Sequence, residues 1–295
     1  MSTDRRPNRT EQRRARALQQ AEGIPYQAAL ARVRGEHAAP TPRTRQERGC
    51  WWCGASGRLT LEHVVPRWIR DALHGAGLLD HAYVEPGGTA PTRSWSAVKP
   101  TFTARVVCAS CNNGWMARLE AAARPRLVAL MRGTPRSLSR VDGELIARWG
   151  AKTALMFQAL EPIPNRVTSA QLYTDLYEAE VLPRTLRVWI GRVQAQGLWQ
   201  HTFAGELRHG GRRAPHFTAL LAMDRLSVMV MGSTDAELLQ AFELGHLRNG
   251  WVEVGATPKS VAWPPAYTFP TDQFPAMPQL LPLLARIPSG TRLGG

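Results

Sequence analysis

The sequence predicts an α+β protein in which a four-cysteine metal module is followed by a mixed α/β region. Two Cys-x-x-Cys pairs, Cys50/Cys53 and Cys108/Cys111, mark the module. An apolar stripe with helical spacing begins near Asp142, and several runs of apolar, β-branched residues follow it. The chain of 295 residues is long enough for one large domain with appendages or for two domains.

The composition favours a protein that binds a polyanion. The formal net charge is +14, and each phosphate that a cation neutralises releases condensed counterions. Of the 37 basic residues all but three are arginines, whose guanidinium group binds phosphate through two hydrogen bonds, although a GC-rich genome would give the same bias. No run approaches the roughly 18 apolar residues of a membrane span, and nothing resembles a secretory signal. We therefore expect a cytoplasmic protein with nucleic acid as its partner.

Residues 1–48 are expected to form a basic, partly helical arm. They carry eleven arginines against five acidic residues. Apolar residues between Arg13 and Arg34 recur at helical spacing, but a glycine and a proline interrupt them. This pattern predicts two short helices with basic tails. The arm either contacts DNA or is a solvated leader.

The cysteine pairs predict a structural zinc site within residues 49–135. A pair with this spacing brings the sulfurs of positions i and i+3 onto one ion, and two pairs supply the four thiolates of a tetrahedral site. The two pairs account for all four cysteines of the chain. A disulfide framework is disfavoured because the sequence shows no export signal. A thioredoxin-like redox pair needs only one Cys-x-x-Cys motif and would leave the second unexplained. A closed four-cysteine site has no open position, so this zinc should stabilise the fold rather than catalyse a reaction.

Chemistry is expected where two segments meet beside the cysteine pairs. Residues 59–66, Leu-Thr-Leu-Glu-His-Val-Val-Pro, predict a strand that ends in an acid–histidine pair. The second cysteine pair continues directly into Asn112 and Asn113, and a helix-compatible stretch follows. Because one ion would join both pairs, Glu62 and His63 should lie close to Asn112.

These motifs resemble the HNH endonuclease family, in the branch that carries zinc-binding cysteine pairs. The resemblance covers about residues 50–120 and rests on Cys-x-x-Cys, Glu-His-x-x-Pro and Cys-x-x-Cys-Asn-Asn-Gly-Trp in this order. It implies a ββα-metal fold, in which two strands and a helix hold a divalent cation against the scissile phosphate. It also implies that His63 is the general base and that Glu62 and Asn112 bind a catalytic Mg²⁺ or Mn²⁺. The commonest family pattern has aspartate and histidine where this chain has Glu62 and Asn112.

The residue types suit this chemistry. A neutral imidazole with a pKa of about 6.5 is a suitable base, and a hard cation prefers oxygen ligands. Asn113 either competes as a cation ligand or stabilises the turn. Arg67 and Arg105 are candidates for contacts with flanking phosphates. The tryptophans of this segment are expected to form its small core rather than to stack on bases: Trp51, Trp52, Trp68 and Trp115.

Residues 136–295 are expected to form a mixed α/β accessory domain with a proline-rich tail. Asp142 is interpreted as the cap of a buried helix, and the tail from Trp263 onward as extended, irregular and on the surface. The region has no cluster of catalytic groups, so we interpret it as recognising substrate or mediating self-association, for example in a homodimer. Strands are expected at 185–193, 216–223, 226–231 and 251–254, and a further helix at 235–244.

The sequence therefore predicts a metal-dependent endonuclease that hydrolyses phosphodiester bonds in DNA, in defence, restriction or mobile-element biology. RNA stays open as a substrate. One alternative is a zinc-dependent DNA-binding protein without catalysis, and another is an interaction protein that zinc merely stabilises. The presence of Glu62, His63 and Asn112 together favours the nuclease.

Overall fold

The structure, a computed structural model, is a mixed α+β protein that divides into two compact units, residues 1–48 and 49–295. Among the described residues, no helix is both long and apolar enough to cross a membrane. The structure describes residues 8–22, 29–30, 33, 49–73, 79–83, 93–97, 102–161, 169–179, 181–194, 197–209, 211–244, 249–255 and 260–270.

The described part of the first unit contains helix α1 (Arg9–Glu22). Asn8 begins this helix, because its Oδ1 accepts a hydrogen bond from the Glu11 backbone N–H at 2.9 Å. The Glu11 carboxylate accepts one from the Asn8 N–H in return, also at 2.9 Å, so the pair forms a reciprocal cap. The expected helix near Arg13 is thus present but begins at Arg9. The basic tails fall outside the described residues.

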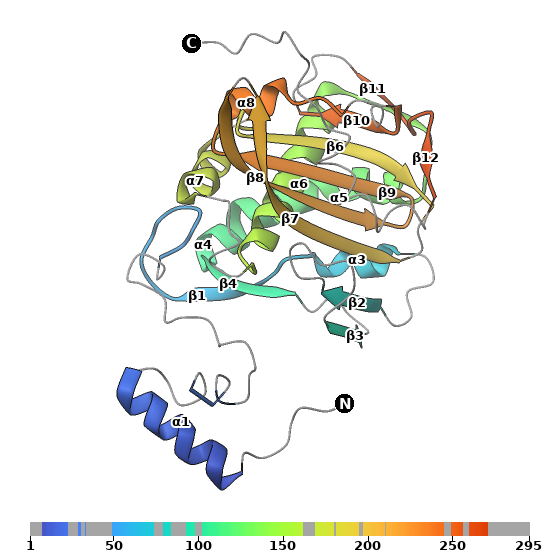
Figure 1. Cartoon of the computed structure of the whole chain (residues 1–295). Coiled ribbons are helices and arrows are strands. Elements are labelled where there is room, and N and C mark those ends of the chain that lie inside the picture. Colours follow the sequence, from blue (N-terminus) through green and yellow to red (C-terminus); the bar gives the residue numbers. More distant parts are fainter. Residues whose placement is uncertain are drawn as a thin grey trace. The chain divides into compact units, whose positions relative to one another are not determined.

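The cysteine-bearing part of the second unit consists of two antiparallel strands followed by a helical segment (Figure 1). The first strand leads into a short helix, and the second leads into a π-helical turn that continues as a longer helix. A separate antiparallel pair lies between them in sequence. The elements are β1 (Leu59–His63), α3 (Arg67–Ala72), β2 (Leu79–Tyr83), β3 (Arg93–Ala97), β4 (Thr103–Cys108), α4 (Ala109–Cys111), η2 (Asn112–Met116) and α5 (Ala117–Met131).

The rest of the second unit is built around a six-stranded sheet with the order β10-β6-β9-β8-β7, and β12 pairs with β6 (Figure 1). The pairing of β12 with β6 is parallel and the other pairs are antiparallel. The strands and helices are β5 (Arg136–Leu138), α6 (Arg140–Gln158), α7 (Ala170–Glu178), β6 (Leu186–Val193), β7 (Leu198–His209), β8 (Arg212–Met223), β9 (Leu226–Ser233), α8 (Ala236–Ala241), β10 (Trp251–Val254), β11 (Val261–Trp263) and β12 (Thr268–Phe269).

Helices cover both faces of this sheet. Successive side chains of a strand point to opposite faces, so Val188 and Ile190 of β6 join the core beneath α6, whereas Trp189 joins the core beneath α8. The first of these cores also contains α5 residues and the cysteine segment. Residues 49–135 and the expected accessory region therefore share one core.

Most of the expected elements in the second half are present, with different ends. Helix α6 is capped by Ser139 rather than by the expected Asp142, which instead completes a capping box from the third helical position. The expectation of an irregular tail is wrong at Trp263, which is buried in β11, where β11 pairs with β5. Helix α7 and strand β7 were not expected from the sequence. Residues 271–295 lie outside the described residues.

The capping box gives a stability prediction. Replacing Ser139 with alanine removes the acceptor of the Asp142 N–H, a bond of 3.1 Å, so we expect the free energy of unfolding to fall by about 1 kcal/mol. Urea denaturation followed by circular dichroism measures this change. Ser137→Ala, an exposed position in β5, is the matched control and should unfold at the wild-type midpoint. Equal midpoints for both variants would contradict the role of the cap.

Candidate metal centre and adjoining site

The four cysteines converge, as the sequence predicted. Their sulfur atoms all lie within 4.8 Å of one another, and the Sγ atoms of Cys53 and Cys108 are 3.7 Å apart. None of the four forms a disulfide. Cys108 also caps α4, because its Sγ accepts a hydrogen bond from the Cys111 N–H at 3.4 Å. The cluster can therefore hold one metal ion through four thiolates.

Backbone hydrogen bonds shape the first cysteine loop. The Gly54 N–H donates to the Cys50 carbonyl at 2.8 Å, and the Cys50 N–H donates to the Ala55 carbonyl at 2.9 Å. Gly54 has a φ of 69°, in the left-handed region that glycine enters without steric cost. The Trp51 N–H donates to the Val106 carbonyl at 3.0 Å, which attaches the loop to β4.

The electrostatics of the cluster favour a bound cation. Burial raises the pKa of the Cys111 thiol, and the neighbouring sulfurs raise it further. Thiolates this close to one another are unfavourable unless a cation compensates their charge. The donor set therefore fits a thiophilic metal ion.

An aromatic cluster surrounds the cysteine loops. Trp52 is buried and meets Trp115 edge-on at 5.0 Å between ring centroids and Tyr173 at 5.2 Å. Trp51 also contacts Tyr173 at 5.2 Å, and Trp115 contacts Tyr177 at 5.8 Å. The two tyrosines come from α7. These tryptophans are thus core residues, as expected, but the core is completed by a helix more than fifty positions along the chain.

The expected site residues Glu62 and Asn112 lie next to each other. The Thr60 hydroxyl donates to the Val107 carbonyl at 2.9 Å, so its oxygen is the acceptor for the Asn112 amide Nδ2 at 3.0 Å. This fixes the orientation of the amide. The same side chain hydrogen-bonds to the Glu62 carboxylate and lowers the pKa of that carboxyl. The amide oxygen Oδ1 of Asn112 is then the atom that remains to bind a cation.

The environment of Glu62 is partly dehydrated and charged. Burial raises the pKa of Glu62, Lys152 opposes that rise, and the neighbouring carboxylate of Glu120 adds to it. A half-buried carboxylate beside an amide oxygen suits a hard divalent cation. The donor types at Glu62 and Asn112 therefore fit Mg²⁺ or Mn²⁺.

The surroundings of His63 favour the neutral form of its imidazole. Burial lowers its pKa, Arg67 lowers it further, and Glu120 acts in the opposite direction. The Arg67 Nε–H donates to His63 Nε2 at 3.3 Å, so Nε2 carries the lone pair and Nδ1 the proton. A neutral histidine at the protein surface can accept a proton from water.

The two strands that carry this site are paired out of step by one residue. Thr60 lies opposite Val107, but Glu62 lies opposite Ala104, so β4 contains one extra residue at this point. Arg105 belongs to the bulged stretch and is exposed. Arg67 and Asn113 are exposed as well, whereas Asn112 is half-buried beside Glu62.

Two functional neighbours of the site were not expected from the sequence, namely Glu120 on α5 and Lys152 on α6. The Lys152 Nζ donates to Glu120 Oε1 at 2.6 Å, and the lysine side chain is 0% exposed. A signal was present, because Lys152 lies three residues after Trp149 and four before Met156, on the buried stripe of α6. A charged residue on an apolar stripe indicates a buried partner.

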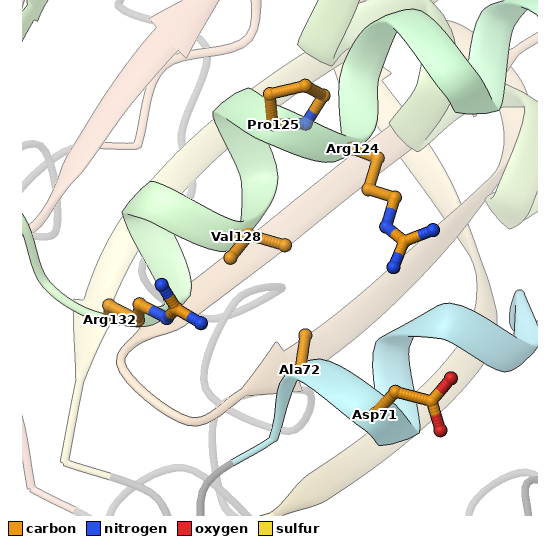
Figure 2. A pocket seen from close by; sticks show the side chains of 6 residues that line it. All are labelled: Asp71, Ala72, Arg124, Pro125, Val128 and Arg132. Atoms are coloured by element: carbon orange, nitrogen blue, oxygen red, sulfur yellow. The ribbon is translucent and has the colours of Figure 1, made fainter.

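A pocket of ≈ 320 Å³ lies between α3 and α5, on the same two helices that adjoin the site. Figure 2 shows Arg124 and Val128 of α5, with Arg132 directly after this helix, on one side of it and Asp71 and Ala72 of α3 on the other. The Arg124 guanidinium lies over the Trp68 ring, 5.7 Å from its centroid, which holds the charge near the pocket.

Comparison of the chain with models of protein families, with curated proteins and with solved structures yields no match.

The sulfur cluster predicts one bound metal ion per chain. Elemental analysis of the purified protein should give this ratio, and Cys111→Ser should lower both the metal content and the thermal unfolding temperature, since metal affinity contributes to folding. Ser110→Ala, an exposed position between the two cysteines of the second pair, is the matched control. Full metal loading of the Cys111 variant would contradict this assignment.

Proposed function

We propose that the chain is a metal-dependent endonuclease of the HNH type that hydrolyses phosphodiester bonds in DNA. The observation that carries the proposal is the pairing of Glu62 with Asn112, which come from the strand after the first cysteine pair and the helical turn after the second. His63 follows Glu62 directly on the same strand. The resemblance of the motifs to the HNH family implies that these three side chains belong to one site.

The proposal gives the two kinds of metal separate tasks. Zn²⁺ on the four cysteines stabilises the fold and takes no part in the reaction, because four thiolates leave it no open position. Mg²⁺ or Mn²⁺, when bound by Glu62 and Asn112, stabilises negative charge on the phosphate and the leaving oxygen. The half-buried carboxylate and the oriented amide supply the oxygen donors that such an ion prefers.

His63 would serve as the general base, and Arg67 would control when it is free. In the absence of substrate the Arg67 Nε–H occupies the lone pair of His63 Nε2. A phosphate oxygen is a stronger acceptor for a guanidinium than a neutral imidazole is. Substrate binding would therefore draw Arg67 away and leave Nε2 to take a proton from the attacking water.

The phosphate backbone on either side of the cut would lie along α3 and α5. Arg67 begins α3, and Arg124 and Arg132 flank the pocket between the two helices (Figure 2). A net charge of +14 strengthens attraction to DNA over the whole surface. Arginine forks suit phosphate contacts, which position a nucleic acid without reading its sequence.

The decisive test of catalysis is cleavage of supercoiled plasmid DNA with Mg²⁺ or Mn²⁺ by the metal-loaded protein. His63→Ala should lower the rate by about 100-fold or more, because it removes the general base. Leu61→Ala is the matched control, since this side chain is 53% exposed on the same strand and should leave the rate unchanged.

Cleavage that persists in the His63 variant would overturn the proposed mechanism. Salt-sensitive DNA binding without cleavage in any divalent metal would instead favour a zinc-dependent DNA-binding protein. Absence of DNA affinity at low salt would favour an interaction protein that the metal stabilises.

The arginines of the pocket give a second prediction. The double variant Arg124→Ala/Arg132→Ala should bind DNA more weakly, and the slope of log affinity against log salt should become shallower by about one to two, since each lost phosphate contact removes about 0.9. Fluorescence anisotropy over a salt series measures both quantities.

The control for this experiment is the double variant Arg208→Ala/Arg212→Ala. These guanidinium groups lie in the β7–β8 hairpin and form ion pairs with Glu206, Asp235 and Glu237. An equal loss of slope in both double variants would mean that the α3–α5 pocket has no special part in binding DNA.

A further inference from the structure

Lys152 is unusual in its place and in its type. Its side chain is fully buried on α6, and its Nζ donates a hydrogen bond to Glu120 Oε1 at 2.6 Å. The chain uses arginine at all but three of its 37 basic positions, and among the described residues Lys152 is the only lysine. Burying an ion pair costs more desolvation than an apolar pair of similar size, so stability alone does not account for this one.

The joining of α5 to α6 does not account for it either. Another ion pair, between Arg126 Nε and Asp142 Oδ1 at 2.8 Å, connects the same two helices. That pair is more exposed, with side chains that are 37% and 21% accessible, and Asp142 belongs to the capping box of α6. It is the structural counterpart of the buried pair Glu120–Lys152.

The buried pair differs from its counterpart in what it faces. Glu120 and Lys152 both act electrostatically on Glu62, in opposite directions, and Glu120 acts on His63 as well. Glu120 lies in the first turn of α5, which continues from the turn that carries Asn112. The two charges are thus near enough to act on the residues that would hold the catalytic cation.

The geometry points to the buried pair as a positioning device that sets the net charge behind the cation site, with Glu120 cancelling the repulsion that Lys152 would exert on a divalent ion. This inference rests on the proposed cation site at Glu62 and Asn112. In an environment of low polarity a single uncompensated charge acts strongly on a nearby divalent ion, so the balance within the pair governs metal affinity. Lys152 is fully buried and its ammonium group is paired with Glu120.

The charge balance makes predictions of opposite sign for the two members. Glu120→Gln leaves the ammonium of Lys152 uncompensated, so Mn²⁺ should bind about tenfold more weakly. Lys152→Met leaves the carboxylate of Glu120 uncompensated, so Mn²⁺ should bind tighter by about the same factor. The double variant removes both charges and should return to within about threefold of the wild-type affinity.

The measurement is the electron paramagnetic resonance signal of free Mn²⁺, titrated into full-length protein whose cysteine site is loaded. It needs no cleavage, so it is independent of nuclease activity. Arg126→Gln and Asp142→Asn are the matched controls, and both should keep the wild-type Mn²⁺ affinity. If circular dichroism shows that Lys152→Met does not fold, Lys152→Arg and Glu120→Gln carry the test. Lys152→Arg retains the positive charge, so it should bind Mn²⁺ as the wild type does.

Two outcomes would overturn the inference. If Glu120→Gln and the double variant bind Mn²⁺ equally weakly, Glu120 is itself a ligand and does not act through charge balance. If every variant binds as the wild type does, the buried pair only joins the helices. Glu62→Gln separates these outcomes from failure of the proposed function: wild-type Mn²⁺ binding that does not depend on Glu62 removes the cation site and the inference with it.

Discussion

The convergence of four sulfur atoms within 4.8 Å is the constraint on which the rest of this structure depends. The first pair lies in the loop before β1, and the second pair extends from the end of β4 to the residue before Asn112. Because the four sulfurs lie together, the strand that carries Glu62 and the turn that carries Asn112 are held close to each other. A metal ion bound by these sulfurs would also supply free energy that assembles the site, because an unfolded chain keeps the two pairs apart.

The cysteine segment is one facet of a larger fold rather than a separate module. On one side α7 supplies Tyr173 and Tyr177 to the tryptophans around the cysteine loops. On another side α6 contributes Lys152, which donates a hydrogen bond to Glu120, and this helix packs in the same core as the sheet. The second half of the chain therefore shapes the surroundings of the site, although the residues expected to do chemistry all come from the first half.

Local patterns in the sequence predicted local features well. The cysteine spacing, the strand that ends at His63 and the apolar stripe of α6 are each patterns of residues within a few positions, and each agrees with the structure. The same patterns do not reveal that Glu120 meets Lys152 or that Thr60 orients Asn112, because these contacts join residues 32 and 52 positions apart. The start of α6 was misplaced because serine and aspartate are both good N-caps, and the capping box uses both. Strand β7 was missed because its polar residues weaken the alternation that a half-buried strand shows.

The extra residue in β4 separates two charges that a regular ladder would bring together. If the pairing of Thr60 with Val107 continued without interruption, the residue opposite Glu62 would be Arg105 instead of Ala104. Side chains opposite each other on neighbouring strands have their Cβ atoms about 5 Å apart, close enough for a guanidinium to neutralise a carboxylate. The bulge places the methyl group of Ala104 there instead, so no guanidinium of β4 neutralises the Glu62 carboxylate. Deletion of Ala104 would restore the regular ladder and place Arg105 opposite Glu62, without changing Glu62, His63 or Asn112.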